Sequence, residues 1–525
     1  MTKATEMAQV SAKGGFHLLW GLVASTVISA VGTIVIARIL GADSYGLYAI
    51  ALTAPNLIST FRDWGVTTAM VKYSAQYNSQ GDVAKVRSIF VSGILFELIL
   101  GLSLSVLSFT LSDFLAVNLQ RPAIAPLIQI VSFFILTAGL VNTATAAFTG
   151  MEKMHLNSVM LILQSIAKTG LIIAFALLGF GTFGAVLGFT IAVLFAALTG
   201  ILLMLTMYRS LPKPTHRKLE LFATTKTMLK YGLPLSIGSI LAGFVAQYYN
   251  YLMAFYVTDN ALIGNYNVAL NFVVLITFFA TPVTTMLFPA FSKLDAKKDR
   301  DVLKNVFQYS VKYAALVVVP VTAMIMALAG PAIGTIFEDR YIQAPLFLAL
   351  LSISYLYAAL GTLSLASIIN SQGDTAYNLK LTVLTVAIGF PVSFALISQF
   401  GIIGLIVTSA TVTLPSLFVS LRFAKNKYGV SVDWLSSARI LLSSVSAALL
   451  TYVVISQLAF SNPIQLIIGV IVFVVAFLFI AVITRTVNRS DVNNMRDIVN
   501  ALGPLRKPLN FVLKLIEKLM NVLKM

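Results

Sequence analysis

The chain has 525 residues, of which 58% are hydrophobic and only 10% are charged, and its formal net charge is +17. Soluble proteins carry about 25% charged residues, so this composition excludes a soluble domain architecture. The basic residues lie in short loops between apolar runs, which indicates membrane orientation and argues against a nucleic-acid partner.

Apolar runs of about 20 residues recur from end to end, and each can cross about 30 Å of hydrocarbon. The first run, residues 14–40, is too long for a cleaved signal peptide and is followed at once by another span. We therefore predict an all-α polytopic membrane protein with fourteen transmembrane helices. The predicted spans are residues 14–40, 46–70, 87–112, 122–149, 156–179, 183–207, 232–257, 262–290, 306–330, 344–369, 376–398, 402–423, 436–459 and 463–486.

The distribution of Lys and Arg predicts the orientation. When the N-terminus is placed in the cytoplasm, the inward loops hold most basic residues, as in SLPKPTHRKLE (210–220) and LDAKKDRD (294–301). The outward loops and their edges hold only Arg38, Arg121 and Arg340. We expect both termini in the cytoplasm and the protein in the cell (cytoplasmic) membrane.

The chain repeats itself at a shift of about 218 to 220 residues. GLYAIAL (46–52) aligns with GNYNVAL (264–270), and FGTFG (180–184) aligns with FGIIG (400–404). The shift spans an even number of helices, so the two copies have the same orientation in the membrane. Such parallel repeats are related by an axis along the membrane normal.

The repeat divides the chain into predicted domains. Residues 1–220 and 221–430 form two parallel six-helix lobes, residues 431–490 form spans 13 and 14, and residues 491–525 form a cytoplasmic tail. Within the tail, LNFVLKLIEKLMNVLKM (509–525) has one polar and one apolar helical face. This pattern predicts a basic amphipathic helix on the cytoplasmic leaflet, with docking on the inner face of the bundle as the alternative.

Two parallel six-helix lobes favour a transporter that works by alternating access. No G-x-x-x-x-G-K-[ST] motif is present, so this chain does not hydrolyse ATP to drive transport. The carboxylates are scattered rather than clustered at one membrane face, which argues against an enzyme. With no cysteines, and with His17, His155 and His216 far apart, we expect neither a metal site nor a cofactor.

Three stretches carry a resemblance to a known family. They are ARILGADSYGLYAIAL (37–52), RDWGVTTAMVKYSA (62–75) and AAFTGMEKMHLNSVM (146–160). The chain resembles the polysaccharide biosynthesis proteins, which are O-antigen-type oligosaccharide flippases of the multidrug/oligosaccharidyl-lipid/polysaccharide exporter superfamily. The resemblance implies a monomer that moves a polyprenyl-pyrophosphate-linked oligosaccharide from the inner to the outer leaflet. Its implied partners are membrane lipids and glycan polymerase, ligase or oligosaccharyltransferase machinery, in cell-surface glycan synthesis or protein glycosylation.

Several ionisable residues fall inside predicted spans, where a charge costs about 2.5–3.5 kcal/mol on insertion scales. The repeat places uncharged residues opposite Arg62, Asp63, Glu97, Lys168 and Lys312. We hypothesise that the three cations line a cavity between the lobes and bind the pyrophosphate, because Arg and Lys recognise phosphate. The two carboxylates would balance charge or couple an ion or a proton.

Each of these residues also has a structural alternative. Arg62 and Asp63 could lie at the headgroups if their helix ends early, and Lys312 could reach the interface along its stem. Glu97 could pair with Lys168 or Arg62 to hold helices together.

A second feature is the polar aromatic stretch AQYYNYLM (246–253) in the seventh span. Amphipathic rings and amides suit sugar hydroxyls, although they also form hydrogen bonds between helices or an aromatic belt. The candidate sugar-contacting residues are Gln247, Tyr248, Tyr249, Asn250, Tyr251, Asn267 and Asn271.

Other members of the superfamily provide alternative functions. These are an ion- or proton-coupled drug exporter and a peptidoglycan-precursor lipid flippase, which PNLIST (55–60) resembles. The first span lacks basic residues between His17 and Arg38, which argues against the peptidoglycan precursor, and the cationic bias argues against cationic drugs. A scaffold for glycan enzymes without transport activity is a third alternative.

Overall fold

The computed structural model describes residues 3–212, 220–296, 298–489, 491–493 and 496, together with residues 510, 513, 514, 517, 518, 520 and 521. Every element within these residues is helical, which confirms the all-α class. The chain divides into two compact units, residues 1–267 with 386–405 and residues 268–385 with 406–525. The lobes predicted from the sequence repeat, with boundaries at 220 and 430, stay a prediction.

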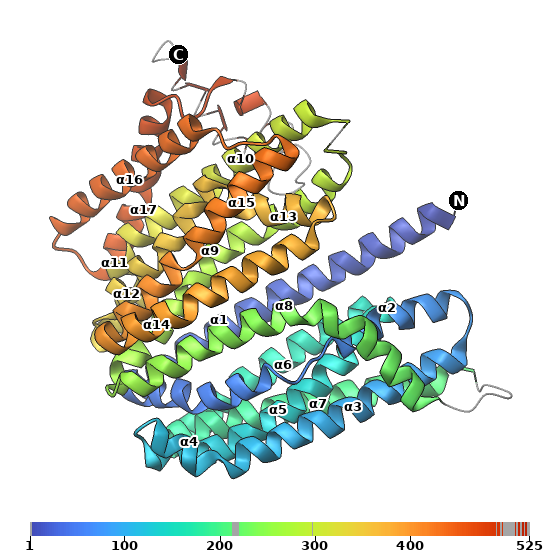
Figure 1. Ribbon diagram of the computed structural model, residues 1–525. Helices are drawn as coiled ribbons and strands as arrows, with labels where there is room; N and C mark the ends of the chain where they lie inside the picture. Colours follow the sequence, from blue (N-terminus) through green and yellow to red (C-terminus); the bar gives the residue numbers. More distant parts are fainter. Residues whose placement is uncertain are drawn as a thin grey trace. The chain divides into compact units, whose positions relative to one another are not determined.

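The first unit is built mainly from the N-terminal helices, drawn blue to green in Figure 1. Its elements are α1 (Lys3–Ser59), α2 (Val66–Ser79), α3 (Val83–Thr110), α4 (Ser112–Asn118), η1 (Pro122–Ile124), α5 (Ala125–Gly150), α6 (Met154–Phe175), η2 (Ala176–Phe180), α7 (Gly181–Ser210) and α8 (Leu221–Tyr256). Two further helices, α9 (Asn260–Ser292) and α14 (Thr375–Thr411), contribute residues to both units.

The second unit contains the remaining helices. They are α10 (Arg300–Ala327), α11 (Ala329–Phe337), η3 (Glu338–Arg340), α12 (Ala344–Ser352), η4 (Ile353–Leu360), α13 (Thr362–Ser371), α15 (Thr413–Tyr428), α16 (Trp434–Ser456) and α17 (Asn462–Ile483). Within it, α10 packs against α16, and α16 packs against α17.

Ten helical stretches of the described chain are long and apolar enough to cross a membrane, or eleven with the bent pair of 344–360 and 362–371. Three of the ten, at 40, 57 and 54 residues, are too long for one crossing, because they extend about 60 to 85 Å. Each is interrupted by glycine with positive φ, at Gly41, at Gly179 and Gly181, and at Gly401. If each of these three crosses twice and the bent pair crosses once, the number of crossings equals the fourteen predicted spans.

One predicted span is wrong at its end. The sequence predicted a continuous helix over residues 46–70, but α1 ends at Ser59 and α2 begins at Val66. Gly65 has a φ of 79°, a left-handed conformation that ends regular helix here. The short helices α4 and α11 were not predicted, because each is too short to form a span of its own.

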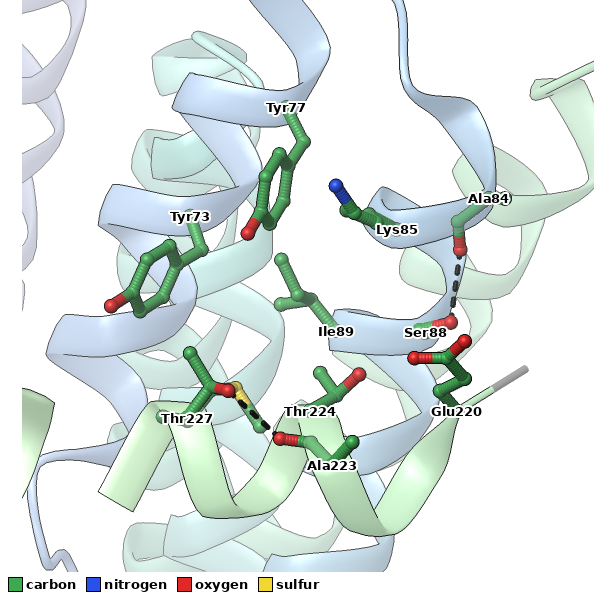
Figure 2. A pocket seen from close by; sticks show the side chains of 11 residues that line it. Tyr73, Tyr77, Ala84, Lys85, Ser88, Ile89, Glu220, Ala223, Thr224 and Thr227 are labelled. Atoms are coloured by element: carbon green, nitrogen blue, oxygen red, sulfur yellow. Dashed lines mark hydrogen bonds between the residues drawn. The ribbon is translucent and has the colours of Figure 1, made fainter. Parts of the chain in front are cut away.

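Small residues hold the first unit together. α1 packs against α6, α5 packs against α7, and α3 packs against α5. The core between them is rich in alanines, and small side chains let membrane helices approach closely. These alanines are Ala69, Ala144, Ala146, Ala147, Ala196 and Ala197. Where α2 ends and α3 and α8 begin, side chains of the three helices surround a cavity (Figure 2).

Two equivalent glycines of the sequence repeat make the same contact. A Cβ atom on Gly46 would lie 1.9 Å from the carbonyl oxygen of Asn260, and one on Gly264 would lie 2.0 Å from that of Ala42. A shift of 218 residues relates Ala42 to Asn260 and Gly46 to Gly264. The contact is therefore reciprocal between the two stretches, 42–46 and 260–264.

The described part of the C-terminal tail packs on the second unit. Leu513 and Met520 are 5% and 4% exposed and share a core with Leu478 and Val482 of α17. Lys514 is exposed. These contacts agree with the docked alternative, while most residues of the predicted 509–525 helix lie outside the described residues.

Candidate functional site

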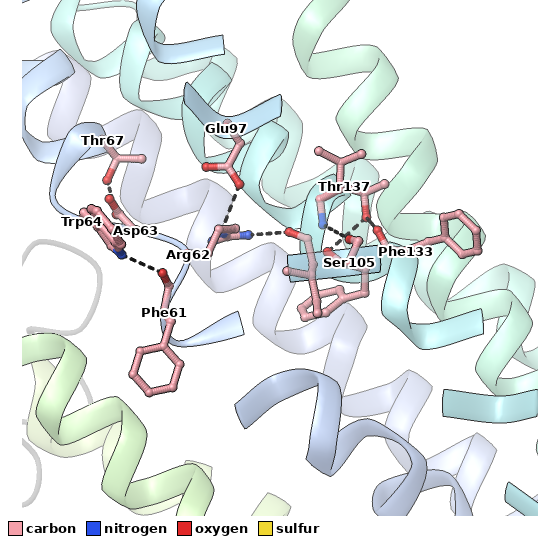
Figure 3. A network of polar contacts seen from close by, with 12 residues as sticks. Phe61, Arg62, Asp63, Trp64, Thr67, Glu97, Ser105, Phe133 and Thr137 are labelled. Atoms are coloured by element: carbon pink, nitrogen blue, oxygen red, sulfur yellow. Dashed lines mark hydrogen bonds and ion pairs between the residues drawn. The ribbon is translucent and has the colours of Figure 1, made fainter. Parts of the chain in front are cut away.

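The segment that joins α1 to α2 carries the first two candidate charges. Asp63 accepts a hydrogen bond from the backbone N–H of Gly65 at 2.9 Å and another from the hydroxyl of Thr67 (Figure 3). Such local bonds satisfy donors at the start of α2, which otherwise lack partners. Asp63 therefore has a structural role in ending one helix and starting the next.

Arg62 points the opposite way, into the helix bundle of the first unit. Its side chain is 7% exposed, its Nε lies 3.3 Å from Glu97 Oε1, and its Nη1 donates to the carbonyl of Ile135 at 3.1 Å (Figure 3). It thus joins the interhelical turn to α3 and α5. Removing one partner from a buried pair typically costs about 3–5 kcal/mol, because the other charge stays buried.

The Glu97 carboxylate fits only because α5 and α3 carry glycines beside it. A Cβ atom on Gly139 would lie 1.5 Å from Glu97 Oε1, and one on Gly101 would lie 2.8 Å from the same oxygen. Of the two pairings the sequence left open for Glu97, the structure contains the one with Arg62. Glu97 and Lys168 form no ion pair in the described chain.

Lys168, on α6, differs from the other cations. Its Nζ lies 5.6 Å from the centre of the Phe189 ring, and no carboxylate pairs with it among the residues described. Phe189 in turn packs against Phe134 and Tyr48, with ring centres 5.2 and 6.5 Å away. Aromatic faces attract a cation weakly and leave the ammonium's hydrogen-bond donors unused.

Lys312, in the second unit, already has a carboxylate partner. Its Nζ lies 2.6 Å from Asp491 Oδ2, and the two side chains are 12% and 3% exposed. Sequence reasoning missed Asp491, because it placed residues 491–525 in a cytoplasmic tail. An acidic residue directly after the last span was the available signal.

The candidate sugar-contacting residues do not share one face. Residues 247–251 are consecutive on α8, where neighbours point about 100° apart. The Tyr248 ring packs against Phe390, with ring centres 4.6 Å apart and planes inclined by 44°, whereas the Tyr251 hydroxyl donates to Asn118 Oδ1 at 2.6 Å. The amide of Asn250 donates to Gln247 at 3.5 Å.

The other three candidates have separate surroundings. The Tyr249 hydroxyl is buried without a hydrogen-bond partner in the described chain. Asn267 donates to the Ile263 carbonyl at 2.8 Å, a bond within α9. Asn271 also lies on α9 and belongs to the second unit.

Arg121 forms a further polar centre, which sequence reasoning noted only as a rare outward basic residue. All five of its N–H donors are used, since Nε donates to Asn260 Oδ1 at 2.6 Å and the others donate to four backbone carbonyls. The carbonyls are those of Leu119, Ala254, Val257 and Thr258. Asn260 also donates to Asp43 at 3.2 Å. We name Arg121, Asn260 and Asp43 the Arg121 clasp.

Comparison with known proteins gives a family match over more than half of the chain. The family described as polysaccharide biosynthesis protein matches residues 35–346. An uncharacterized membrane protein of Methanocaldococcus jannaschii is 20% identical over 382 residues, 69% of this chain and 74% of that protein. The probable low-salt glycan biosynthesis flippase Agl15 of Haloferax volcanii is 21% identical over 324 residues, 59% of this chain and 65% of that protein. The chain thus spans slightly less than two thirds of the flippase's length.

Solved structures share the fold at low sequence identity. The lipid II flippase MurJ in an inward closed conformation superposes with a TM-score of 0.71 at 14% identity, over 89% of this chain and 98% of that one. An inward-facing multidrug resistance MATE family transporter of the MOP superfamily superposes with a TM-score of 0.58 at 14% identity, over 78% and 98%. Apart from the uncharacterized membrane protein, the relatives and neighbours named here are described as flippases or transporters and not as enzymes, which agrees with the sequence prediction.

Proposed function

Because the chain belongs to the polysaccharide biosynthesis protein family, we propose that it is a flippase for a polyprenyl-pyrophosphate-linked oligosaccharide. The glycan lipid moves from the cytoplasmic to the outer leaflet of the cell membrane by alternating access, and both termini lie in the cytoplasm. The resemblance of residues 37–52 and 62–75 and the relation to a probable glycan flippase support this substrate class.

The observation that carries the proposal is that Lys168 has no carboxylate partner among the described residues. Among the three candidate cations, Arg62 lies beside Glu97 and Lys312 beside Asp491, whereas within the described part of the chain Lys168 contacts the Phe189 ring and pairs with no carboxylate. A cation held in an apolar bundle without a counter-charge is costly and attracts an anion. The pyrophosphate of the glycan lipid supplies that anion, and Lys168 is its first contact.

Arg62 and Lys312 act at a later stage in this account. A pyrophosphate that reaches either cation displaces a carboxylate, Glu97 or Asp491, which then takes up a proton or an ion. This exchange would couple glycan movement to charge balance. Asp63 keeps its place at the start of α2 and sets the direction of the neighbouring Arg62.

The sugar contacts come from polar and aromatic side chains of α8 and α9. Tyr248 presents an aromatic ring, Gln247 and Asn250 present amides, and Tyr249 has an unused hydroxyl. Tyr251, Asn267 and Asn271 are the remaining contacts in this account. Rings and amides match the C–H faces and hydroxyls of sugars.

The Arg121 clasp closes the outer end of the first unit in this conformation. It joins the segment before α5 to the end of α8 and the start of α9, beside the close contact of Gly46 with Asn260. Alternating access requires this end to open, so the clasp must break during each cycle.

The test is mass spectrometry of polyprenyl-pyrophosphate glycans in cells depleted of this protein, with an impermeant probe reporting the leaflet. We expect complete glycan lipids to accumulate on the cytoplasmic face. Wild-type protein and Lys304→Ala, which alters an exposed lysine of α10, should restore export. Lys168→Ala should not, although it reaches the membrane in equal amount.

Two results would contradict the proposal. Unchanged glycan lipids together with altered sensitivity to cationic drugs would indicate a drug exporter of the same superfamily. Accumulation of a peptidoglycan precursor alone would assign the other alternative substrate.

A further inference from the structure

The cavity between α2, α3 and α8 lies in the first unit and has no part in the charged site described above. Its volume is about 120 Å³, and it is open on one side. Figure 2 shows side chains from all three helices around it. Lys85 and Arg87 lie in the first turns of α3, and the sequence before α8 contains Lys213, Arg217 and Lys218, so this end of the unit is the one predicted to face the cytoplasm.

One wall of the cavity is aromatic and its floor is apolar. Tyr73 and Tyr77 lie one turn apart on α2, with ring centres 6.0 Å apart and planes inclined by 17° (Figure 2). Ile89 and Met228, which are 1% and 0% exposed, form the floor. The two tyrosines therefore line one side of the cavity with aromatic rings.

The residues that line the cavity also supply hydrogen-bonding groups. The hydroxyls of Tyr73, Tyr77 and Thr224 have no hydrogen-bond partner within the described residues, and each can donate and accept. Ser88 donates to the Ala84 carbonyl at 3.0 Å, so its oxygen can still accept. Glu220 adds a carboxylate, which only accepts. The cavity thus combines one apolar face with several donors and acceptors.

The charges around the cavity favour a neutral ligand over a phosphate. Lys85 already pairs with Asp82 at 3.2 Å and lies 4.7 Å from the Tyr77 ring. Lys72 does not line the cavity, and its Nζ lies 3.6 Å from the centre of the Tyr231 ring and 5.0 Å from that of the Tyr73 ring. A phosphate would meet the Glu220 carboxylate and find no cation without a partner among the described residues that line the cavity.

We infer that this cavity is a carbohydrate site that holds one sugar ring of the glycan before the lipid enters the transport path. The C–H face of a pyranose packs on Tyr73 and Tyr77, while its hydroxyls bond to Thr224, Ser88 and Glu220. The inference rests on the proposed function, since it takes the sugar to be part of the flippase substrate.

Ligand-observed saturation-transfer NMR tests the site directly, with glucose and N-acetylglucosamine as probes and the full chain in nanodiscs. Tyr77→Leu removes the ring face and Thr224→Val removes the hydroxyl at constant shape. We expect each variant to weaken sugar binding at least tenfold. Thermal unfolding of the same samples verifies that both variants are folded.

The matched control is Tyr309→Leu. Tyr309 and Tyr313 form a similar stacked pair on α10, 5.9 Å apart and inclined by 15°, but neither lines this cavity. Sugar binding should be unchanged in this variant. Absence of binding to the wild-type chain, or equal binding by the variants Tyr77→Leu and Thr224→Val, would overturn the inference.

A second measurement identifies the source of the sugar. Flipping of synthetic polyprenyl-pyrophosphate-linked N-acetylglucosamine in proteoliposomes should need several-fold more substrate for half-maximal rate with Tyr77→Leu. Unaltered flipping by a variant that no longer binds free sugar would overturn the link to the glycan. If the wild-type chain binds sugar but flips no glycan lipid, the result would contradict the proposed function and still support the carbohydrate site.

Discussion

Glu97 lies in the middle of α3 with its carboxylate against the backbone of Gly139, where any side chain would displace it. Its pairing with Arg62 holds the turn between α1 and α2 against α3 and α5. The charged stretch TFRDWG, residues 60–65, is therefore a break between helices whose two charges have separate partners. The sequence showed that the charges are present, but not that the helix ends before them, because a left-handed glycine does not interrupt an apolar run.

Gly139→Ala tests the buried pair. The added methyl would force Glu97 away from Arg62, so we expect a loss of about 3 kcal/mol in the free energy of unfolding. Gly170→Ala is the matched control, since a Cβ atom there meets nothing within 4 Å. That substitution should be neutral or stabilising by up to about 1 kcal/mol, because alanine favours helix. Equal effects of the two substitutions, measured by denaturant unfolding in micelles, would show that the pair does not hold these helices.

Because of Asp374, in the turn before α14, we expect the free energy of unfolding to depend on pH. Hydrogen bonds from Lys427 and from the Tyr428 hydroxyl hold the pKa of its carboxyl below the ordinary value. A lowered pKa means that the stabilisation is present above the unfolded-state pKa of about 3.9 and is lost as the pH falls through the folded-state pKa. Because the side chains are 23% and 50% exposed at Asp374 and Lys427, the pair contributes at most about 1 kcal/mol.

Thermal unfolding of Asp374→Asn measures this contribution. We expect the variant to unfold at a lower temperature than the wild-type chain at pH 7, and the difference to shrink below about pH 4. Asp113→Asn removes an exposed carboxylate that has no ion pair among the described residues, and it should show no such trend. A difference that is constant from pH 7 to pH 3 would contradict the assignment.

At the scale of helices, breaks at glycine decide how the apolar runs become elements. The sequence predicted separate spans on either side of Gly41, of Gly179 and Gly181, and of Gly401, whereas the structure joins each pair into one long, kinked stretch. Span positions were predictable because apolar runs of membrane length are unambiguous. Whether two neighbouring spans form separate helices or one kinked helix was not predictable. A loop sequence such as GADS is compatible with both.

The Arg121 clasp joins the ends of several helices, and no sequence motif indicates it. Four of its five acceptors are backbone carbonyls, so no partner residue type marks it in the sequence. We expect Arg121→Lys to loosen the clasp, because an ammonium has three donors in place of five. The chain has no cysteine, so a single Ile263→Cys, at a buried position of α9, can report opening.

Labelling of that cysteine by an impermeant maleimide should be about tenfold faster in Arg121→Lys, which corresponds to about 1.4 kcal/mol. Arg340→Lys, at another of the three basic residues predicted to face outward, should leave the rate unchanged. Equal labelling rates in the two variants would show that Arg121 does not keep this end closed.

At the scale of the whole chain, composition, the parallel repeat and the inward basic loops predicted a polytopic transporter, and the family match and shared fold agree. The site was less predictable. Sequence reasoning named Arg62, Lys168 and Lys312 together, yet ion pairs with Glu97 and Asp491 distinguish two of them from the third. Ion pairing depends on contacts between helices that are remote in the chain, and these contacts cannot be inferred from apolar periodicity.

The most direct measurement is flipping of a synthetic polyprenyl-pyrophosphate-linked N-acetylglucosamine by the purified chain in proteoliposomes, with a membrane-impermeant enzyme reporting sugar in the outer leaflet. We predict transfer by the wild-type chain and by Lys304→Ala, and a rate at least a hundredfold lower for Lys168→Ala, with partial recovery in Lys168→Arg. Equal transfer by Lys168→Ala and the wild-type chain would contradict the role of Lys168. No transfer above that of protein-free liposomes would contradict the proposed function.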